Sequence, residues 1–425
     1  MLIEFTVANF RSFREKFTLS LSASTDKWLE DDNVGHVGDQ RLLKSAAIYG
    51  PNAGGKSNLM MAMRHMRQWV LASSKEGQAG EKIPVSPFRL NTKTEDAPSF
   101  FEVMFVVGPT RYRYGFEADS EKVCTEWLLS RADSTRETTL FTRDGENITP
   151  GAEFREGSGL EERTRSNALF LSVVAQFNGR IAGEVVAWFD RFRAISGLND
   201  DGYIGFTAGL LRTETMRQRI VELMHKADVG IEDLRSQEVS PEKFSAALPP
   251  NLPKSVRVEL LKAAQQAFEL KTFHRKFDGD KPVDGLVEFD LGTDESAGTA
   301  KYLGLLGPFL DTLSEGSVLL VDELEARLHP RLTKALVGLF NSSANRRHAQ
   351  LVFATHDAGL LDARSVRRDQ VWFVEKDSQG ASSLYPLTDF KVRKEAKIGK
   401  EYLLGQFGGV PHLGDMRETL LHATE

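Results

Sequence analysis

Eight residues near the N-terminus, residues 50–57, match the phosphate-binding pattern G-x-x-x-x-G-K-[ST] at every position. Glycines let such a loop curl its backbone N–H groups around a phosphate. A lysine adds positive charge, and the hydroxyl group of the final serine can bind Mg²⁺. The pattern therefore predicts nucleotide binding. The residues expected at the ligand are Asn52, Ala53, Gly54, Gly55, Lys56, Ser57 and Asn58.

Two adjacent carboxylates, Asp322 and Glu323, follow an apolar run much later in the chain. The run predicts a buried strand, which places both residues at its end. Asp322 can then join the Mg²⁺ shell beside Ser57, while Glu323 can accept a proton from, or orient, a water molecule that attacks a terminal phosphate. A lone aspartate here would more simply cap a turn, but the phosphate loop favours the acidic side of a nucleotide hydrolase.

Two other segments place polar residues at the end of a predicted element, one before a helix and one after a strand. Residues 294–299 form a turn of small residues before a helix-like segment, so Ser296 and nearby backbone N–H groups can donate to a phosphate from a different direction than Lys56. An ordinary helix cap by Ser296 is the alternative interpretation. Another apolar run ends in His356, where open α/β sheets bind their ligands, so this side chain can contact the γ-phosphate or the attacking water.

The elements that position these residues are also readable. Residues 45–49 predict a buried strand before the loop, and apolar residues at helical spacing predict a helix after it. Alternating residues 3–7 and 17–21 predict two strands, and residues 101–107 and 112–116 predict an antiparallel hairpin. From residue 181 to residue 273 helical spacing dominates, with interruptions at Pro241 and at residues 248–253, which predicts a helical insertion.

Composition excludes several classes of protein. The chain has 425 residues, of which 41% are hydrophobic and 27% are charged, as is ordinary for a globular protein. Its single cysteine, Cys124, excludes an internal disulfide and suits a reducing cytoplasm. No signal peptide or membrane span is recognisable, so we expect a cytoplasmic protein. The net charge of -6 argues against general coating of a polyanion, so any contact with nucleic acid must be focal.

The order of the motifs resembles that of the ATP-binding-cassette ATPases, specifically their soluble SMC and RecF-like branch. More closely, the chain is similar to ATPases of bacterial anti-phage and abortive-infection systems, the AbiLi and RloA-like proteins. The motifs that carry the resemblance are NFRSF (residues 9–13), the phosphate loop, ESAGT (295–299), DELEARLHP (322–330), THD (355–357) and GQFGGVP (405–411).

This resemblance implies ATP and Mg²⁺ as ligands and at least a homodimer. The phosphate loop of one protomer would face Ser296 and Gly298 of another, with ATP between them. Gln176 would be the Q-loop glutamine, which senses Mg²⁺ and the attacking water, and Arg11 or Arg14 would touch phosphate.

The resemblance also implies a fold, an α/β head with a mixed core sheet, an antiparallel β subdomain and a helical insertion. The domains would be residues 1–180, 181–275 and 276–425. The chain departs from the family pattern at ESAGT, where transporter-type members have LSGGQ, and at Glu325, where aspartate is common.

The sequence does not decide which biological process the ATPase would control. About 70 residues follow His356, too few for an appended nuclease, and they include basic residues that form either a solvated helix face or a focal contact with DNA or RNA. Three hypotheses stand: a sensor or scaffold that controls a separately encoded effector such as a nuclease, a RecF-like DNA-repair clamp, and an assembly protein with structural ATP. The basic residues are Lys391, Arg393, Lys394, Lys397 and Lys400.

Overall fold

The computed structural model describes residues 1–76, 78–132, 136–198, 201–239, 268–392 and 397–411. The chain forms two compact units. The first comprises Met1–Ile195, Glu315–Leu324 and Val337–Glu425, and the second comprises Ser196–Ser314 and Glu325–Leu336. The three intervals predicted from the sequence therefore differ from the compact units, because the chain returns to the first unit after residue 336.

A seven-stranded sheet forms one layer of the first unit, and each pair of neighbouring strands in it is antiparallel. The two N-terminal strands and the hairpin predicted from the sequence are both confirmed. In spatial order the strands are β10 (Asn147–Pro150), β9 (Thr138–Asp144), β8 (Val123–Ala132), β7 (Thr110–Ala118), β6 (Ser99–Val107), β1 (Leu2–Ala8) and β2 (Phe17–Ser20).

A six-stranded mixed sheet forms the other layer. Strands β15, β16, β5 and β17 run parallel, whereas β18 is antiparallel to β17. Because β15, β16 and β5 are consecutive neighbours, their carboxyl ends lie at one edge. In spatial order the strands are β11 (Arg193–Ser196), β15 (Val318–Asp322), β16 (Gln350–Ala354), β5 (Ser45–Tyr49), β17 (Val371–Lys376) and β18 (Ser382–Pro386).

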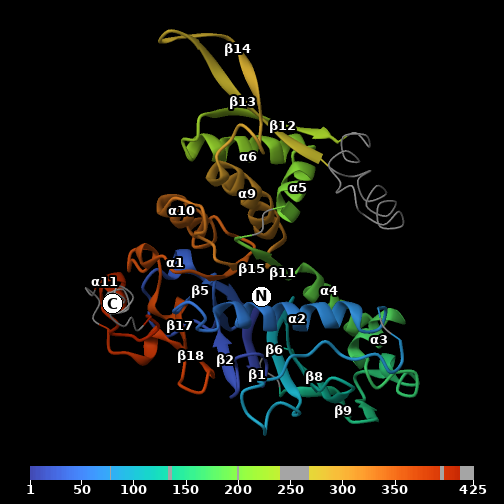
Figure 1. Cartoon of the computed structure of the whole chain (residues 1–425). Helices are drawn as coiled ribbons and strands as arrows, with labels where there is room; N and C mark the ends of the chain where they lie inside the picture. The colour runs from blue at the N-terminus through green and yellow to red at the C-terminus, as the bar shows by residue number, and fades with distance from the viewer. Residues whose placement is uncertain (77, 133–135, 199–200, 240–267, 393–396, 412–425) are drawn as a thin grey trace, which may run out of the picture. The chain divides into compact units, whose positions relative to one another are not determined.

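Helix α2 (Lys56–Ala72) lies between these sheets (Figure 1). Its buried side chains, including Leu59, Met63 and Met66, share one apolar core with side chains of β1, β6, β15 and β16. Burying each large apolar side chain contributes roughly 1.5–3 kcal/mol. The core therefore fixes the helix that follows the phosphate loop against both sheets.

Helices α3 (Phe170–Gln176) and α4 (Arg180–Arg191) also belong to the first unit. Trp188 of α4 stacks on Phe105 of β6 with ring centroids 4.0 Å apart, which explains why α4 packs here. The remaining elements that lie wholly in this unit are α1 (Glu30–Asn33), β3 (Val34–Val37), β4 (Gln40–Leu43), α11 (Ile398–Leu403) and the 3₁₀ helices η1 (Arg155–Gly157), η3 (Ala358–Leu360), η4 (Arg368–Gln370) and η5 (Leu387–Asp389).

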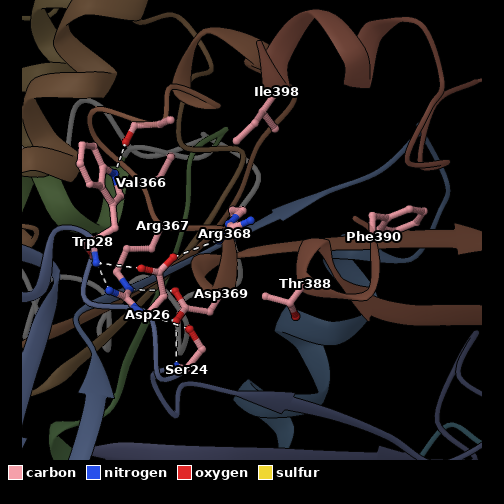
Figure 2. Close-up of a pocket in the computed structure, with 11 residues that line it drawn as sticks. Ser24, Asp26, Trp28, Val366, Arg367, Arg368, Asp369, Thr388, Phe390 and Ile398 are labelled. Atoms are coloured by element: carbon pink, nitrogen blue, oxygen red, sulfur yellow. Dashed lines mark hydrogen bonds and ion pairs between the residues drawn. The ribbon is translucent and has the colours of Figure 1, made fainter. Parts of the chain in front are cut away.

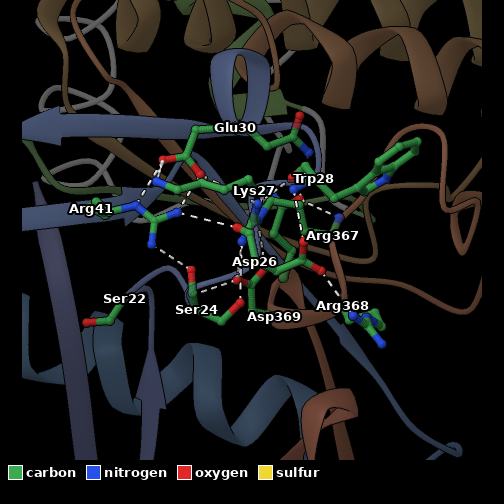
Figure 3. A network of polar contacts seen from close by, with 12 residues as sticks. Ser22, Ser24, Asp26, Lys27, Trp28, Glu30, Arg41, Arg367, Arg368 and Asp369 are labelled. Atoms are coloured by element: carbon green, nitrogen blue, oxygen red, sulfur yellow. Dashed lines mark hydrogen bonds and ion pairs between the residues drawn. The ribbon is translucent and has the colours of Figure 1, made fainter. Parts of the chain in front are cut away.

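A network of ion pairs ties the N-terminal segment to the residues before β17 (Figure 3). Arg367 and Asp369 form a buried pair 2.7 Å apart, and Arg368 bonds Asp26 at 3.0 Å. The Arg41 guanidinium bound to Glu30 lowers the pKa of that carboxyl group to about 2. The network anchors the chain where it enters β17, the neighbour of β5.

The described residues of the predicted helical insertion, 181–275, form strands as well as helices, so this interval is not helical throughout. Strand β13 pairs with β12 on one side and with β14 on the other. These strand pairs depend on tertiary contacts, which the helical spacing of the sequence does not reveal. Pro241 and residues 248–253 lie outside the described residues. The elements of the second unit are α5 (Asp201–Leu210), α6 (Glu214–Lys226), β12 (Ile231–Glu238), β13 (Phe268–Asp278) and β14 (Lys281–Asp290), with α9 (Ala297–Glu315) and α10 (Pro330–Phe340) extending beyond it.

Within the part of the chain that the structure describes, no helix combines the length and apolar character needed to cross a membrane.

Candidate nucleotide-binding site

The phosphate loop connects β5 to α2, as its sequence predicts, and its glycines lie too close to neighbouring atoms for a side chain. A Cβ atom at Gly50 would lie 2.2 Å from the carbonyl oxygen of Val374. At Gly55 it would lie 2.3 Å from Ser382 Oγ, and the Gly55 φ of 122° is itself unfavourable for other residues. Glycine is therefore required for the path of the loop.

Helix α2 presents an uncapped N-terminus at the end of this loop. Its N-cap residue is Gly55, and no described side chain accepts a hydrogen bond there. The first N–H groups of a helix favour an anion, so this end suits a phosphate. The Lys56 ammonium is buried and donates to the carbonyl oxygens of Gly50 at 2.9 Å and Pro51 at 3.1 Å, which brings its charge against the loop.

Two side chains from segments distant in sequence, Ser12 and Ser382, brace the loop together with Asn58 of α2. Ser382 of β18 donates from Oγ to the carbonyl oxygen of Gly54 at 2.7 Å. Its hydroxyl group also lies 2.7 Å from that of Ser12, and Asn58 donates to the same Ser12 oxygen at 2.7 Å. The side-chain NH₂ group of Asn58 is thus part of this brace, and a contact of Asn58 with a ligand stays a prediction.

The carboxyl ends of three parallel strands bring the acidic residues and the histidine to the loop. Val321 of β15 pairs with Phe353 of β16, and Ala354 of β16 pairs with Ile48 of β5. The same edge of the sheet consequently carries Asp322, His356 and the start of the phosphate loop. Adjacent strands are about 4.8 Å apart, so the ends of β15 and β5 are about 10 Å apart.

Asp322 fits a role in Mg²⁺ binding. Its Oδ1 atom is buried and has no hydrogen-bond partner among the described residues, an arrangement that is costly unless a ligand completes it. Ser57 is the second residue of α2, at the same sheet edge, and Mg²⁺ prefers oxygen donors such as its hydroxyl group. The described residues contain no cluster of three or more His, Cys, Asp or Glu side chains suited to a metal. Asp322 and Ser57 are the residues that would hold Mg²⁺ here, together with the phosphates.

Glu323 adopts a left-handed backbone conformation, with φ of 54°. The next residue, Leu324, donates its N–H group to the carbonyl oxygen of Ala354 at 3.2 Å, which holds the turn against β16. Non-glycine residues adopt this conformation rarely, and they concentrate at functional sites. The turn keeps Glu323 next to Asp322 at the sheet edge.

His356 is exposed and lies two residues after the end of β16 (Gln350–Ala354). Asp357 stabilises the following turn, because its Oδ1 accepts from Gly359 N–H at 2.8 Å. The Tyr49 hydroxyl group donates to the Asp357 carbonyl oxygen at 3.1 Å, which links this turn to the last residue of β5. This hydrogen bond therefore holds the turn after His356 next to the start of the phosphate loop.

The predicted turn at residues 294–299, which contains ESAGT and is called the signature turn below, lies in the second unit at the start of α9. The Ser296 hydroxyl group accepts from the N–H group of Thr299 at 3.0 Å, so it caps the helix as the alternative interpretation holds. A Cβ atom at Gly298 would lie 2.8 Å from the carbonyl oxygen of Arg327, which explains the glycine. A role of these residues toward ATP stays a prediction.

Gln176 is not brought to the phosphate loop. It ends α3, where Ser172 donates to the carbonyl oxygen of Val70 near the far end of α2 at 2.7 Å. Val70 follows Lys56 by 14 residues, or about 21 Å along the helix axis. The apolar run before Gln176 forms a helix against α2 and does not lead into the site, so the Q-loop assignment is corrected.

The predicted arginines occupy two different places. The Arg11 guanidinium lies 5.8 Å from the ring centroid of Phe10, which stacks on His65 in α2. Arg14 instead donates to Gln379 Oε1 at 2.5 Å, in the turn that precedes Ser382. Arg14 is thus the arginine connected to the elements that brace the loop.

The basic stretch near the C-terminus is only partly described. Lys391, Lys397 and Lys400 are exposed, and Arg393 and Lys394 lie outside the described residues. A cavity of about 260 Å³ lies beside it, lined by Trp28, Arg368, Phe390 and Ile398 among others (Figure 2). None of its described lining residues belongs to the phosphate loop, so it is separate from the nucleotide site.

Ser382 is the site residue that sequence reasoning missed. It belongs to no motif, and only the pairing of β18 with β17 brings it behind the loop. Ser12 lies in the NFRSF motif, but the sequence does not indicate that its hydroxyl group meets Asn58.

Comparison with solved structures finds SMC head domains and RecF, all at low similarity. The SMC head domain from Thermotoga maritima is 14% identical with a TM-score of 0.39, covering 91% of this chain and 98% of that one. An SmcHead bound to the C-winged helix domain of ScpA is 13% identical with a TM-score of 0.40, covering 91% and 97%. The recombination mediator RecF with ATP is 14% identical with a TM-score of 0.34, covering 90% and 97%.

Sequence comparison is more decisive. No curated protein matches the chain. A family profile described as "AAA domain, putative AbiEii toxin, Type IV TA system" matches residues 45–362, which include the phosphate loop, the signature turn, Asp322, Glu323 and His356. The chain belongs to this AAA domain family, AAA_21.

Proposed function

We propose that this protein is an ATPase that closes as a homodimer around ATP. The observation that carries the proposal is the convergence of the phosphate loop, Asp322, Glu323 and His356 at one sheet edge. Backbone N–H groups and Lys56 would bind the phosphates, and His356 would contact the γ-phosphate. Ser57 and Asp322 would hold Mg²⁺, which would neutralise charge on the phosphates.

Hydrolysis would use Glu323 as the base. The oxygen of a water molecule attacks the γ-phosphorus, its proton passes to Glu323, and the bond from the γ-phosphorus to the bridging oxygen of ADP breaks. In the closed dimer, Ser296 and Gly298 of the second protomer would complete the γ-phosphate contacts. ATP can drive closure only by as much as it binds the closed state better than the open one.

The Glu323→Gln variant tests this mechanism. We expect it to bind ATP like the wild type, to hydrolyse it about 100-fold more slowly or worse, and to accumulate as a dimer in sedimentation with ATP. Glu315→Gln is the matched control and should behave as the wild type. Glu315 is exposed and precedes the N-terminal end of β15, whereas Glu323 follows the C-terminal end. A variant that binds ATP but stays monomeric contradicts the dimer mechanism.

The biological role that we propose is a sensor or scaffold in anti-phage defence, as in the AbiLi and RloA-like proteins. The family description, which names a putative AbiEii toxin and a type IV TA system, supports a function in a system of that kind. The effector, a nuclease or another toxin, would be encoded separately and held according to the nucleotide state. Copurification from the native host in ATP and in ADP tests this role. A neighbouring gene product retained in one nucleotide state supports it, and ATP-dependent retention of DNA alone favours a repair clamp.

A further inference from the structure

Glu295, which stands directly before Ser296, is bound to strand β13. Its Oε1 atom accepts a hydrogen bond from the Thr272 hydroxyl group and lies 2.6 Å from His274 Nε2. The Glu295 side chain is only 8% exposed. A buried carboxylate is stable only with such partners, so this contact fixes the residue in place.

The preceding residue is held in the same way. The Asp290 N–H group at the end of β14 donates to Asp294 Oδ2 at 2.7 Å, and the Asp294 N–H group returns a bond to the Asp290 carbonyl oxygen at 2.9 Å. His274 also packs on Phe289 of β14, with ring centroids 4.5 Å apart. The turn is thus attached to both strands of the hairpin β13–β14, which is drawn in yellow in Figure 1.

These contacts give Glu295 a different task from that of its neighbours. Its Oε1 atom is occupied by β13, whereas Ser296 caps α9 one residue later. The position of Ser296 and of the first N–H groups of α9 therefore depends on where Glu295 is anchored. The glutamate in ESAGT, where transporter-type sequences have leucine, has a structural reason in the polar partners that β13 offers.

We propose that Glu295 is a positioning residue, which sets the signature turn against β13 so that the turn meets the ATP of the other protomer as a preformed unit. The inference rests on the proposed function, in which the turn acts on the partner's nucleotide. Its effect should fall on turnover and closure and leave ATP binding to the phosphate loop of the same protomer unchanged.

Glu295→Ala and Glu295→Gln separate geometry from charge. The glutamine carbonyl can still accept from Thr272 and His274, whereas alanine cannot. We expect Glu295→Ala to lower kcat and ATP-driven dimerisation about tenfold or more, as for lost hydrogen bonds to a charged group, with ATP affinity within about twofold of wild type. Glu295→Gln should recover most of the rate. Glu232→Ala, which breaks the 3.2 Å ion pair with Arg275 on the same sheet, is the control and should retain wild-type turnover.

Mixing variants tests whether the residue acts across the dimer. Glu295→Ala has an intact phosphate loop and a displaced turn, and Lys56→Ala has the reverse. In a mixed dimer one of the two sites combines both intact halves, so an equal mixture should regain about a quarter of the wild-type rate. Each variant alone should stay inactive or nearly so.

The outcomes distinguish the inference from the function on which it rests. If the wild type neither hydrolyses ATP nor dimerises with it, the proposed function fails. If the wild type does both and Glu295→Ala matches it, or if mixing restores nothing, the positioning role is overturned. The positioning role is also overturned if Glu295→Ala weakens ATP binding and lowers the melting temperature together, since that result indicates a general structural role.

Discussion

The starts of helices α2 and α9 are built from similar small residues but are held in opposite ways. The turn before α2 is braced from outside by Ser12 and Ser382, and no described side chain caps the helix. The turn before α9 is held by the hairpin β13–β14, and Ser296 caps the helix from within. The first helix end is therefore ready for an anion, while the second has a hydroxyl group that is already hydrogen-bonded.

This difference assigns different roles to the two turns. A braced loop with uncapped N–H groups binds phosphate without rearrangement, so it should determine ATP affinity. In the capped turn, Ser296 accepts the bond from the Thr299 N–H group and keeps its own proton, so the cap fixes the hydroxyl group while leaving it able to donate to a phosphate. We infer that the second turn contributes when two protomers close, and that variants of the two turns should have separable effects.

The largest effect should come from the loop lysine. Lys56→Ala removes the buried ammonium that bonds Gly50 and Pro51, together with its attraction for phosphate. We expect ATP affinity to fall by about 100-fold or more, because charge-assisted hydrogen bonds to phosphate are lost. Calorimetric titration with ATP measures this, with exposed Lys75→Ala, just past the end of α2, as control. Undiminished binding would remove the loop from the site.

Changing the brace should have the next largest effect. Gly55→Ala forces a Cβ atom against Ser382 Oγ, so ATP binding should approach the Lys56→Ala level. Ser382→Ala removes the bond to Gly54 and should weaken ATP binding about tenfold, as for a buried carbonyl group left unpaired. Ser383→Ala, at a half-buried neighbour in β18, is the control. Wild-type affinity in Ser382→Ala would show that the loop keeps its path without the brace.

The sequence predicts the parts of the site that local pattern determines. Gly50, Lys56, Asp322 and His356 are recognisable because each motif lies at the end of a buried strand, and strand ends converge in a parallel sheet. Ser382 could not be predicted, because its role depends on β18 returning beside β17. Gln176 was misplaced for a similar reason, since the apolar run before it is explained by tertiary packing, against Phe141 and Phe154 as well as α2. The same limit applies to β13, whose ladder partners lie far away in the sequence.

The apolar contacts that anchor α2 should make the stability of the fold depend on pH through His65. Burial lowers the pKa of His65 to about 4 from 6.5, and its ring packs on Phe10 and Trp69. Because the folded pKa lies below the unfolded one, protonation favours unfolding. The stability contributed is complete above about pH 6.5 and is lost as pH falls toward 4. We expect wild type to lose about 2 kcal/mol more than His65→Phe between pH 7 and 5 in denaturant titrations. Parallel pH profiles of the two proteins would contradict this assignment.

The smallest effect should separate the two tasks of Ser296. Ser296→Ala removes the helix cap and should cost about 1 kcal/mol of stability, whereas glycine at an N-cap costs only a few tenths of that. Neither variant has a hydroxyl group to give to a phosphate. If Ser296 acts on ATP in the closed dimer, both variants should lose ATP-driven dimerisation by a similar factor, although only alanine lowers the melting temperature clearly. If glycine restores dimerisation together with stability, Ser296 is a cap alone, and the contribution of the second turn must come from the backbone of α9.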